Sequence, residues 1–128
     1  MLDTNIVSDL VRNPGGAIAR RIAEVGDAGL AVSIIVAAEL RFGGAKRGSV
    51  ALIRQIEAIL SGLLVMPFES PADAEYASVR AELERRGRSI GGNDLLIAAH
   101  ALALGVPLVT RNIEEFSRVP RLNVMNWA

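Results

Sequence analysis

Four polar side chains stand where apolar segments of this sequence end or where a helix is expected to begin. Asp3 follows the apolar start of the chain, and Asn112 follows the apolar run VPLVT. Glu39 lies early in a helix expected after the run LAVS, and Asp94 begins the apolar run DLLIAAHALALG. In an open α/β sheet, ligands bind outside the carboxyl ends of the strands, and the helices that follow strands begin at that same edge. We therefore expect these four side chains to converge on one spot.

Three of the four residues are acidic, and carboxylates gathered at one spot repel one another. A hard divalent cation would relieve that repulsion. The chain contains no Cys and a single His, so thiolate ligands and paired imidazole ligands are excluded. Oxygen ligands alone suit Mg²⁺, with Mn²⁺ as a substitute. Such a site can activate a water molecule and stabilise a leaving oxygen, so the expected chemistry is metal-dependent hydrolysis of phosphodiester bonds.

Each of these residues also has a purely structural interpretation. Asp3 would be a turn or cap residue, and Glu39 would lie on a solvated helix face, although its neighbours in IIVAAELRF are apolar. Asp94 would be an acidic residue favoured by a helix N-terminus, and Asn112 would be an N-cap. His100, in the middle of an apolar helix, is expected to be a partly buried side chain and not a ligand or base. Only the four residues taken together favour a site.

The elements that must position these side chains alternate along the chain. Strands are predicted at 1–3, 30–33, 63–68, 106–110 and 122–127. Helices are predicted at 4–13, 17–25, 50–60, 70–88, 94–104 and 112–116, and the ambiguous segment 34–48 favours helix. Strands separated by helices imply right-handed crossovers. The predicted fold class is therefore α/β, a single domain over residues 1–128 with a mostly parallel sheet sandwiched by helices.

Capping residues mark several of these helix starts. Thr4 is expected to cap the first helix. Ser70 is expected to cap the helix whose first position is Pro71, since proline lacks the N–H that this position leaves unpaired. Asn112 and Glu115, three residues apart, match a capping box.

Composition bounds the class of protein. The chain has 128 residues, of which 51% are hydrophobic and 22% charged, which suits one domain with a packed core. The absence of Cys is compatible with a reducing cytosol, and no signal peptide or membrane span is recognisable, so we expect a cytoplasmic protein. Basic and acidic residues both number 14. Acids away from the four candidate residues, such as Asp9, are expected on solvated helix faces.

Several segments together resemble a known family. LDTN, AAELRFG, RAELERRGRSIGGNDLLIAAHAL and LVTRNIEEF are similar to the PIN-domain ribonucleases, specifically the VapC-type toxins of bacterial toxin–antitoxin pairs. The most specific stretch, RAELERRGRSIGGNDLLIAAHA, resembles the branch of tRNA(fMet)-specific endonucleases. The resemblance covers nearly the whole chain. It implies a PIN fold and a Mg²⁺-dependent endoribonuclease, with tRNA as a target and Asp3, Glu39 and Asp94 as metal ligands.

The resemblance also assigns supporting roles and partners. Thr4 or Asn5 would support Asp3 and contact the substrate, and Asn112 would occupy the fourth polar position. A homodimer and a cognate VapB antitoxin that occludes the site are implied as well. This chain departs from the family pattern in three places. Many members carry an acid at the position of Asn112, relatives often have Gly-Pro where GGN precedes Asp94, and relatives commonly have a longer first strand. Either that strand is short here, or the start of the chain is clipped.

RNA binding needs cations that the balanced net charge does not reveal. Two clusters supply them: Arg41, Lys46 and Arg47, and Arg80, Arg85, Arg86 and Arg88. From these clusters we expect Arg41, Arg80 and Arg86 to contact the substrate. With one Trp, one Tyr and three Phe, no aromatic platform for base stacking is available, so phosphate contacts would dominate. The alternative is a solvated helix face with pairs such as Glu82 and Arg86.

Other classes of protein fit the sequence less well. A receiver-like phosphoacceptor would need an acid pair at the first strand and a Lys after a late strand, and MLDTN and VTRN supply neither. A haloacid-dehalogenase-type phosphatase would need a second Asp two residues after Asp3, where Asn5 stands. A non-catalytic α/β protein-binding module remains the alternative, and such a module has no reason to bind Mg²⁺.

Overall fold

The computed structural model describes residues 1–26 and 29–127. In this part of the chain, seven helices alternate with four short strands. The helices are α1 (Thr4–Arg12), α2 (Ala17–Val25), α3 (Ile34–Arg47), α4 (Val50–Ser61), α5 (Ala72–Arg85), α6 (Gly92–Leu104) and α7 (Ile113–Phe116). The strands are β1 (Ala31–Ser33), β2 (Leu64–Met66), β3 (Leu108–Val109) and β4 (Val124–Met125). The predicted α/β class is confirmed.

The strand pairings in the described residues are all parallel. Strand β1 pairs with β2, and β3 pairs with β4. The start of the chain lies between the two pairs. The backbone N–H of Leu2 donates to the carbonyl of Ala31 at 2.8 Å, and Leu2 also forms a parallel bridge with Val109. The first strand predicted at 1–3 is present only as this bridge, which places Asp3 at the middle of the parallel arrangement.

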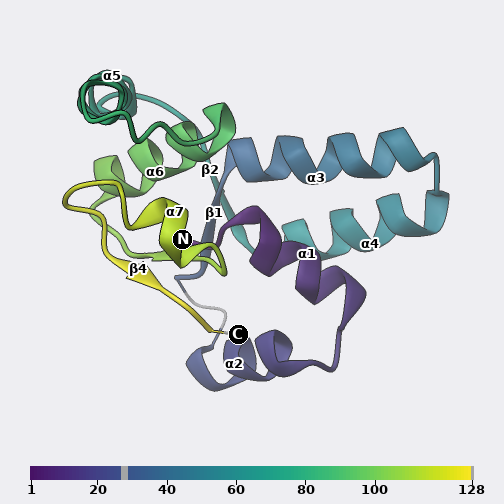
Figure 1. The fold of residues 1–128 in the computed structure, drawn as a ribbon. Helices are drawn as coiled ribbons and strands as arrows, with labels where there is room; N and C mark the ends of the chain where they lie inside the picture. Colours follow the sequence, from purple (N-terminus) through teal and green to yellow (C-terminus); the bar gives the residue numbers. More distant parts are fainter. Residues whose placement is uncertain (27–28, 128) are drawn as a thin grey trace.

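The helices lie on both sides of the strands. In Figure 1, α5 and α6 lie to one side, and α1 with the α3–α4 hairpin lies to the other. Helix α6 is apolar almost all round, and residues 97–101 on it are buried, as its sequence predicted. The core also contains fully buried side chains from several other elements, among them Leu2, Ile6, Ile18, Val32, Leu83, Leu108 and Phe116. One core therefore ties the start of the chain to its C-terminal part.

Proline limits two of the strands that the sequence predicts as longer. The segments predicted at 63–68 and 106–110 contain ladder pairings only at 64–66 and 108–109. Pro67 directly follows β2 and Pro107 directly precedes β3, and proline has no N–H to donate to a ladder. The last predicted strand, 122–127, is likewise reduced to 124–125.

The ambiguous segment after β1 is helical throughout, as α3. Ser33 caps this helix, since its hydroxyl oxygen accepts from the N–H of Ile35 at 3.1 Å. Two other helices end where glycine was expected to end them. Gly87 follows α5 and Gly105 follows α6, with φ of 65° and 66°, a backbone conformation that other residues rarely adopt. Helix α2 ends at Val25, and the stop predicted for it falls partly on residues 27–28, outside the described residues.

Two predicted caps are wrong. Asp3, and not Thr4, caps α1, because the Asp3 side chain accepts from the N–H of Thr4. Ser70 does not cap α5, since the helix begins at Ala72 and Pro71 occupies the cap position without a side-chain hydrogen bond. Ser70 therefore lies one residue too early to reach the unpaired N–H groups of the helix.

The capping box predicted before α7 does not form. Asn112 occupies the cap position, but its side chain makes no cap hydrogen bond. Its amide instead donates to the carboxylate of Glu115. The spacing that suggested a capping box therefore corresponds to a contact between the side chains of Asn112 and Glu115.

No helix in the described part of the chain is both long and apolar enough to cross a membrane.

Candidate functional site

The four candidate residues line one open hollow of about 330 Å³. Asp3 directly follows Leu2, which links the two pairs of strands, and Glu39 lies in the second turn of α3. Asp94 lies in the first turn of α6, and Asn112 immediately precedes α7. The remaining lining comes from helix α1: Thr4, Asn5, Ser8 and Arg12. The topology therefore brings together residues that the sequence separates by up to 109 positions.

Asp3 is held in place by two hydrogen bonds, one to each carboxylate oxygen. The N–H of Thr4 donates to Oδ1 at 2.8 Å, and the hydroxyl of Thr110 donates to Oδ2 at 2.7 Å. Burial raises the pKa of Asp3, and the two hydrogen bonds oppose that rise. Thr110 is itself fully buried and also accepts from the amide of Asn5 at 3.3 Å. Sequence reasoning missed Thr110, although its place at the end of the run VPLVT is a usable signal.

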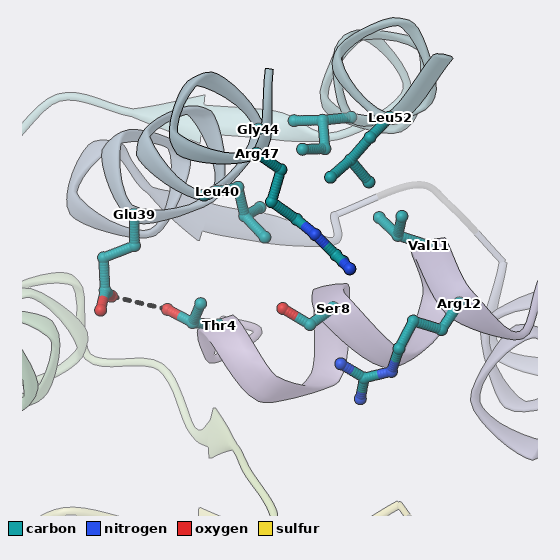
Figure 2. Close-up of a pocket in the computed structure, with 11 residues that line it drawn as sticks. Thr4, Ser8, Val11, Arg12, Glu39, Leu40, Gly44, Arg47 and Leu52 are labelled. Carbon is teal, nitrogen blue, oxygen red and sulfur yellow. Dashed lines mark hydrogen bonds between the residues drawn. The ribbon is translucent and has the colours of Figure 1, made fainter. Parts of the chain in front are cut away.

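Thr4 supports Asp3, as expected, through its backbone N–H, and its hydroxyl contacts a second carboxylate. The hydroxyl of Thr4 donates to Oε1 of Glu39 at 2.7 Å (Figure 2). Asn5 reaches Asp3 only through Thr110. The first turn of α1 thus orients two acids of the hollow at once.

Asp94 carries the most perturbed ionisation in the hollow. Burial, together with the charges of Glu115, Asp3 and Glu39 and a hydrogen bond with Glu115, raises the pKa of Asp94 to about 7. A carboxyl group with such a pKa exchanges its proton near neutral pH, whereas an exposed Asp does so near 3.9. The sequence predicted that acids gather at one spot, and the charges of these neighbours contribute to the raised pKa of Asp94.

Glu115 is a fifth polar residue at the edge of the hollow, outside the predicted set of four. Its Oε1 accepts from the backbone N–H of Gly91 at 3.0 Å, and its Oε2 accepts from the amide of Asn112. Gly91 lies beside both acids, since a Cβ at this position would be in ordinary van der Waals contact with Oδ2 of Asp94, at 3.4 Å, and with Oε1 of Glu115, at 3.9 Å. The spacing of three residues from Asn112 was the available signal, but it was interpreted as a cap.

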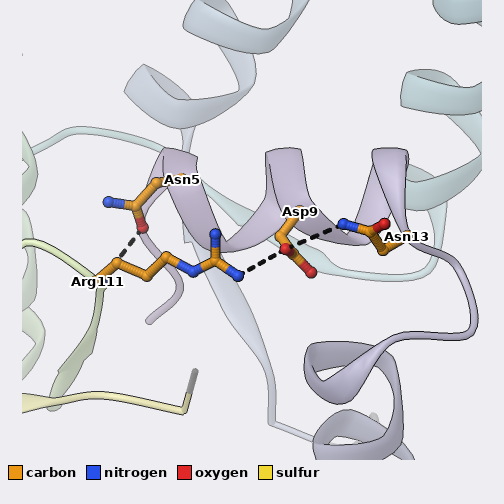
Figure 3. A network of polar contacts seen from close by, with 4 residues as sticks. All are labelled: Asn5, Asp9, Asn13 and Arg111. Atoms are coloured by element: carbon orange, nitrogen blue, oxygen red, sulfur yellow. Dashed lines mark hydrogen bonds and ion pairs between the residues drawn. The ribbon is translucent and has the colours of Figure 1, made fainter.

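An ion pair behind the hollow anchors the loop that carries Asn112. Arg111 donates to Oδ2 of Asp9 at 2.6 Å, and the amide of Asn13 donates to the same oxygen at 3.2 Å (Figure 3). The backbone N–H of Arg111 donates to the side-chain oxygen of Asn5 at 3.2 Å. Asp9 is only 6% exposed, so its predicted place on a solvated helix face is wrong. Burial is possible because the Arg111 guanidinium compensates the charge.

The arginines predicted to bind substrate do not line the hollow. Arg41 makes two hydrogen bonds to Glu57, at 2.9 and 3.0 Å. Arg80 pairs with Glu84 at 3.3 Å, and Arg86 pairs with Glu82 at 2.8 Å. These pairs are solvent-exposed, so water and salt screen them and they contribute little to stability. Contact between these arginines and RNA stays a prediction.

A divalent cation fits the donor chemistry of the hollow. The acidic side chains offer only oxygen atoms, and burial together with their mutual repulsion already raises the pKa of Asp94. Within residues 1–26 and 29–127, no three His, Cys, Asp or Glu side chains approach closely enough to hold one ion directly. Mg²⁺ tolerates this arrangement, because it commonly keeps several waters and is bound through one or two carboxylates.

Comparison with known proteins gives consistent matches over the full length of the chain. The PIN domain family matches residues 1–122. Ribonuclease VapC2 of Rickettsia felis is 39% identical, over 99% of this chain and 96% of its own length. The tRNA(fMet)-specific endonuclease VapC of Salmonella typhimurium is 33% identical, over 99% of this chain and 96% of its own length.

Two solved structures have the same fold. A crystal structure of VapBC2 from Rickettsia felis, bound to a DNA fragment from its promoter, matches with a TM-score of 0.91 and 37% identity, over 100% of this chain and 98% of that chain. The DNA-bound VapBC of Salmonella typhimurium matches with a TM-score of 0.91 and 33% identity, over 100% of this chain and 97% of that chain. This chain, with its helices on both sides of parallel strands, therefore has the same fold as these two proteins.

Proposed function

This chain belongs to the PIN-domain family, with VapC ribonucleases among its relatives, and on that premise we propose that it is a metal-dependent endoribonuclease toxin of a type II toxin–antitoxin system. It hydrolyses phosphodiester bonds of RNA, with tRNA as a target class. The observation that carries the proposal is the convergence of Asp3, Glu39, Asp94 and Asn112 on one solvent-open hollow. The tRNA target is supported by the name of the Salmonella relative.

In this proposal Asp3, Glu39 and Asp94 would hold Mg²⁺ or Mn²⁺ together, with at least one of the three acting through a bound water. The bound cation supplies a water of lowered pKa and stabilises the oxygen that leaves the phosphate. The chain's own hydrogen bonds pre-orient the ligands: Thr110 holds Asp3, and Thr4 holds Glu39. Ligands fixed in this way lose less conformational freedom when they bind.

Asp94 and Asn112 differ in the chemistry they bring. Burial and the neighbouring acids raise the pKa of Asp94 to about 7 in the metal-free protein, and a cation held by this carboxylate would stabilise its ionised form and lower that pKa. Asn112 carries no charge and does not act as a base. Its amide contacts Glu115 and, in the proposal, orients that carboxylate and water at the rim of the hollow.

The partner in this proposal is a short VapB-type antitoxin, because the structural relatives are VapBC complexes. An apolar groove of about 190 Å³ adjoins the acidic hollow and is lined in part by Val11, Leu40, Leu52 and Ile56. We expect the C-terminal segment of the antitoxin to cover this groove and to extend an Arg or Lys to the acids, since Arg can pair with carboxylates through two hydrogen bonds. A cytoplasmic homodimer completes the proposal.

RNA cleavage by the purified protein tests the proposed activity. Mg²⁺ should support cleavage of bulk tRNA, and EDTA should abolish it. Asp3→Asn, Glu39→Gln and Asp94→Asn should each abolish cleavage. Asp73→Asn, an exposed acid at the start of α5, is the matched control and should cleave normally. Full activity in any one of the three variants would remove that residue from the site.

Two further measurements address the metal and the antitoxin. Unsubstituted protein should gain thermal stability with Mg²⁺ as RT ln(1 + [L]/Kd), and the variants should gain less. Co-purification with the antitoxin should weaken when Asp3, Glu39 and Asp94 are neutralised together. Unweakened co-purification would show that the charge contact is unimportant. Mapping of cleavage sites in total RNA after induction identifies the target.

A further inference from the structure

Two arginines face the groove beside the acidic hollow. Arg47 lies in the last turn of α3, and Arg12 lies in the last turn of α1. Both line the 190 Å³ groove, together with Ser8. In Figure 2 the side chain of Arg47 extends from α3 toward α1 and Ser8, and the side chain of Arg12 turns back along α1. Three side chains that can donate hydrogen bonds are thus gathered in one groove.

Neither guanidinium has a partner among the residues that the structure describes. No hydrogen bond or ion pair joins the side chain of Arg12 or Arg47 to any other residue in the described part of the chain. This distinguishes them from Arg41, Arg80 and Arg86, each of which already pairs with a glutamate. Two unpaired cations that face one groove repel each other, and an anion bound between them would relieve that repulsion. Guanidinium groups bind phosphate particularly well, because their fork of N–H donors matches its oxygens.

The groove is continuous with the acidic hollow. Thr4, Ser8, Arg12 and Glu39 line both. A strand of RNA whose reacting phosphate lies at the acids would therefore run its neighbouring backbone past these arginines.

We propose that Arg12, Arg47 and Ser8 form a phosphate-binding subsite that holds the RNA backbone next to the reacting phosphate. The inference rests on the proposed ribonuclease function and adds a substrate-positioning site to it. The subsite is built from residues that share the groove and have no competing partner. Arg12 and Arg47 are therefore better candidates for phosphate contacts than Arg41, Arg80 and Arg86, which already pair with glutamates.

The salt dependence of RNA binding tests this subsite. A labelled single-stranded oligouridylate is titrated with the full chain in EDTA, so that no cleavage occurs, over a series of salt concentrations. Each phosphate contact with single-stranded RNA contributes about 0.7 to the slope of log affinity against log salt. Because one phosphate bound between the two arginines is the minimal occupant, the double substitution Arg12→Gln with Arg47→Gln should flatten that slope by at least about 0.7, and each single substitution should flatten it by part of that amount. Arg54→Gln is the matched control, because Arg54 is exposed on α4, unpaired and outside both cavities.

Cleavage of bulk tRNA in Mg²⁺, measured in parallel, separates this inference from the proposed function. Flattened slopes for Arg12→Gln and Arg47→Gln, with unchanged cleavage positions and an unaffected Arg54→Gln, would support the subsite. If the unsubstituted protein cleaves RNA but neither slope changes, the subsite is refuted while the ribonuclease stands. If the unsubstituted protein neither binds nor cleaves RNA, both fail. An unchanged slope with weaker capture of the co-expressed antitoxin would assign the two arginines to the protein partner and overturn the proposal.

Discussion

The burial of Asp94 and the carboxylates around it predict that a neutral side chain at this position stabilises the metal-free protein. Asp94→Asn keeps the shape of the side chain and removes its charge. In the folded protein, burial and the charges of Glu115, Asp3 and Glu39 raise the pKa of Asp94 to about 7. Above that pH the folded state must hold an ionised carboxylate in unfavourable surroundings. We therefore expect Asp94→Asn to unfold at a higher temperature than the unsubstituted protein at mildly alkaline pH.

The sign and size of the effect follow from the two pKa values. Because the folded pKa lies above the unfolded one, the associated stability is fully present below about 3.8 and is lost as the pH rises through about 7. That difference corresponds to at most about 4 kcal/mol. Asp94 is partly exposed, and solvent screening reduces the expected value to about 1–2 kcal/mol. For a chain of this length, a gain of that size raises Tm by about 3–10 °C.

Thermal unfolding in EDTA measures the effect. The difference in Tm between Asp94→Asn and the unsubstituted protein should be larger at about pH 8 than at about pH 5. Asp73→Asn removes an exposed acid from the first turn of α5 and should not stabilise at either pH. An equal difference at both pH values, or no stabilisation at the higher one, would refute the reasoning that burial and the neighbouring acids disfavour the ionised form of Asp94.

Three further substitutions test other parts of the arrangement. Asn112→Asp should raise Mg²⁺ affinity in a calorimetric titration, because it adds a carboxylate. It should also lower metal-free stability, because the new charge faces Glu115. Arg111→Gln should lower the free energy of unfolding by about 1–3 kcal/mol in chemical denaturation, because nearly buried Asp9 loses its ion-pair partner. Phe116→Ala should lower it by about 3–5 kcal/mol, because a fully buried ring leaves a cavity, and should slow RNA cleavage through the neighbouring Glu115.

Each of these has a contrary outcome. Unchanged metal affinity in Asn112→Asp would mean that position 112 does not face the cation. Unchanged stability in Arg111→Gln would mean that Asp9 is hydrated in solution. Full cleavage by a destabilised but folded Phe116→Ala would mean that the place of Glu115 does not matter to the reaction.

Local physics explains why most of the helices could be predicted. Periodic apolar residues and glycine stops depend on neighbours within a turn or two, so α2, α4 and the end of α5 follow from short windows of sequence. The helix starts were harder. Asp3 and Thr4 are both acceptable N-caps, and only the backbone geometry decides between them.

The members of the candidate site could be predicted for a different reason. Parallel strands present their carboxyl ends at one edge, so Asp3 and Asn112 were assigned to that edge by topology alone, and Glu39 and Asp94 by the helices that begin there. Residue type then limited the chemistry to oxygen ligands.

What the sequence by itself determined is the order of helices and strands, the convergence of four polar residues and the oxygen-only set of donor atoms that they offer. Only the tertiary structure decided the burial of Asp9, whose partner Arg111 lies 102 positions away. The raised pKa of Asp94 and the contacts of Glu115 were likewise decided there. Burial, repulsion and ion pairing depend on distances between side chains remote along the chain, and a window of sequence contains no such distance. For the same reason, the two unpaired arginines in the groove could be recognised only once α1 and α3 were seen to lie together.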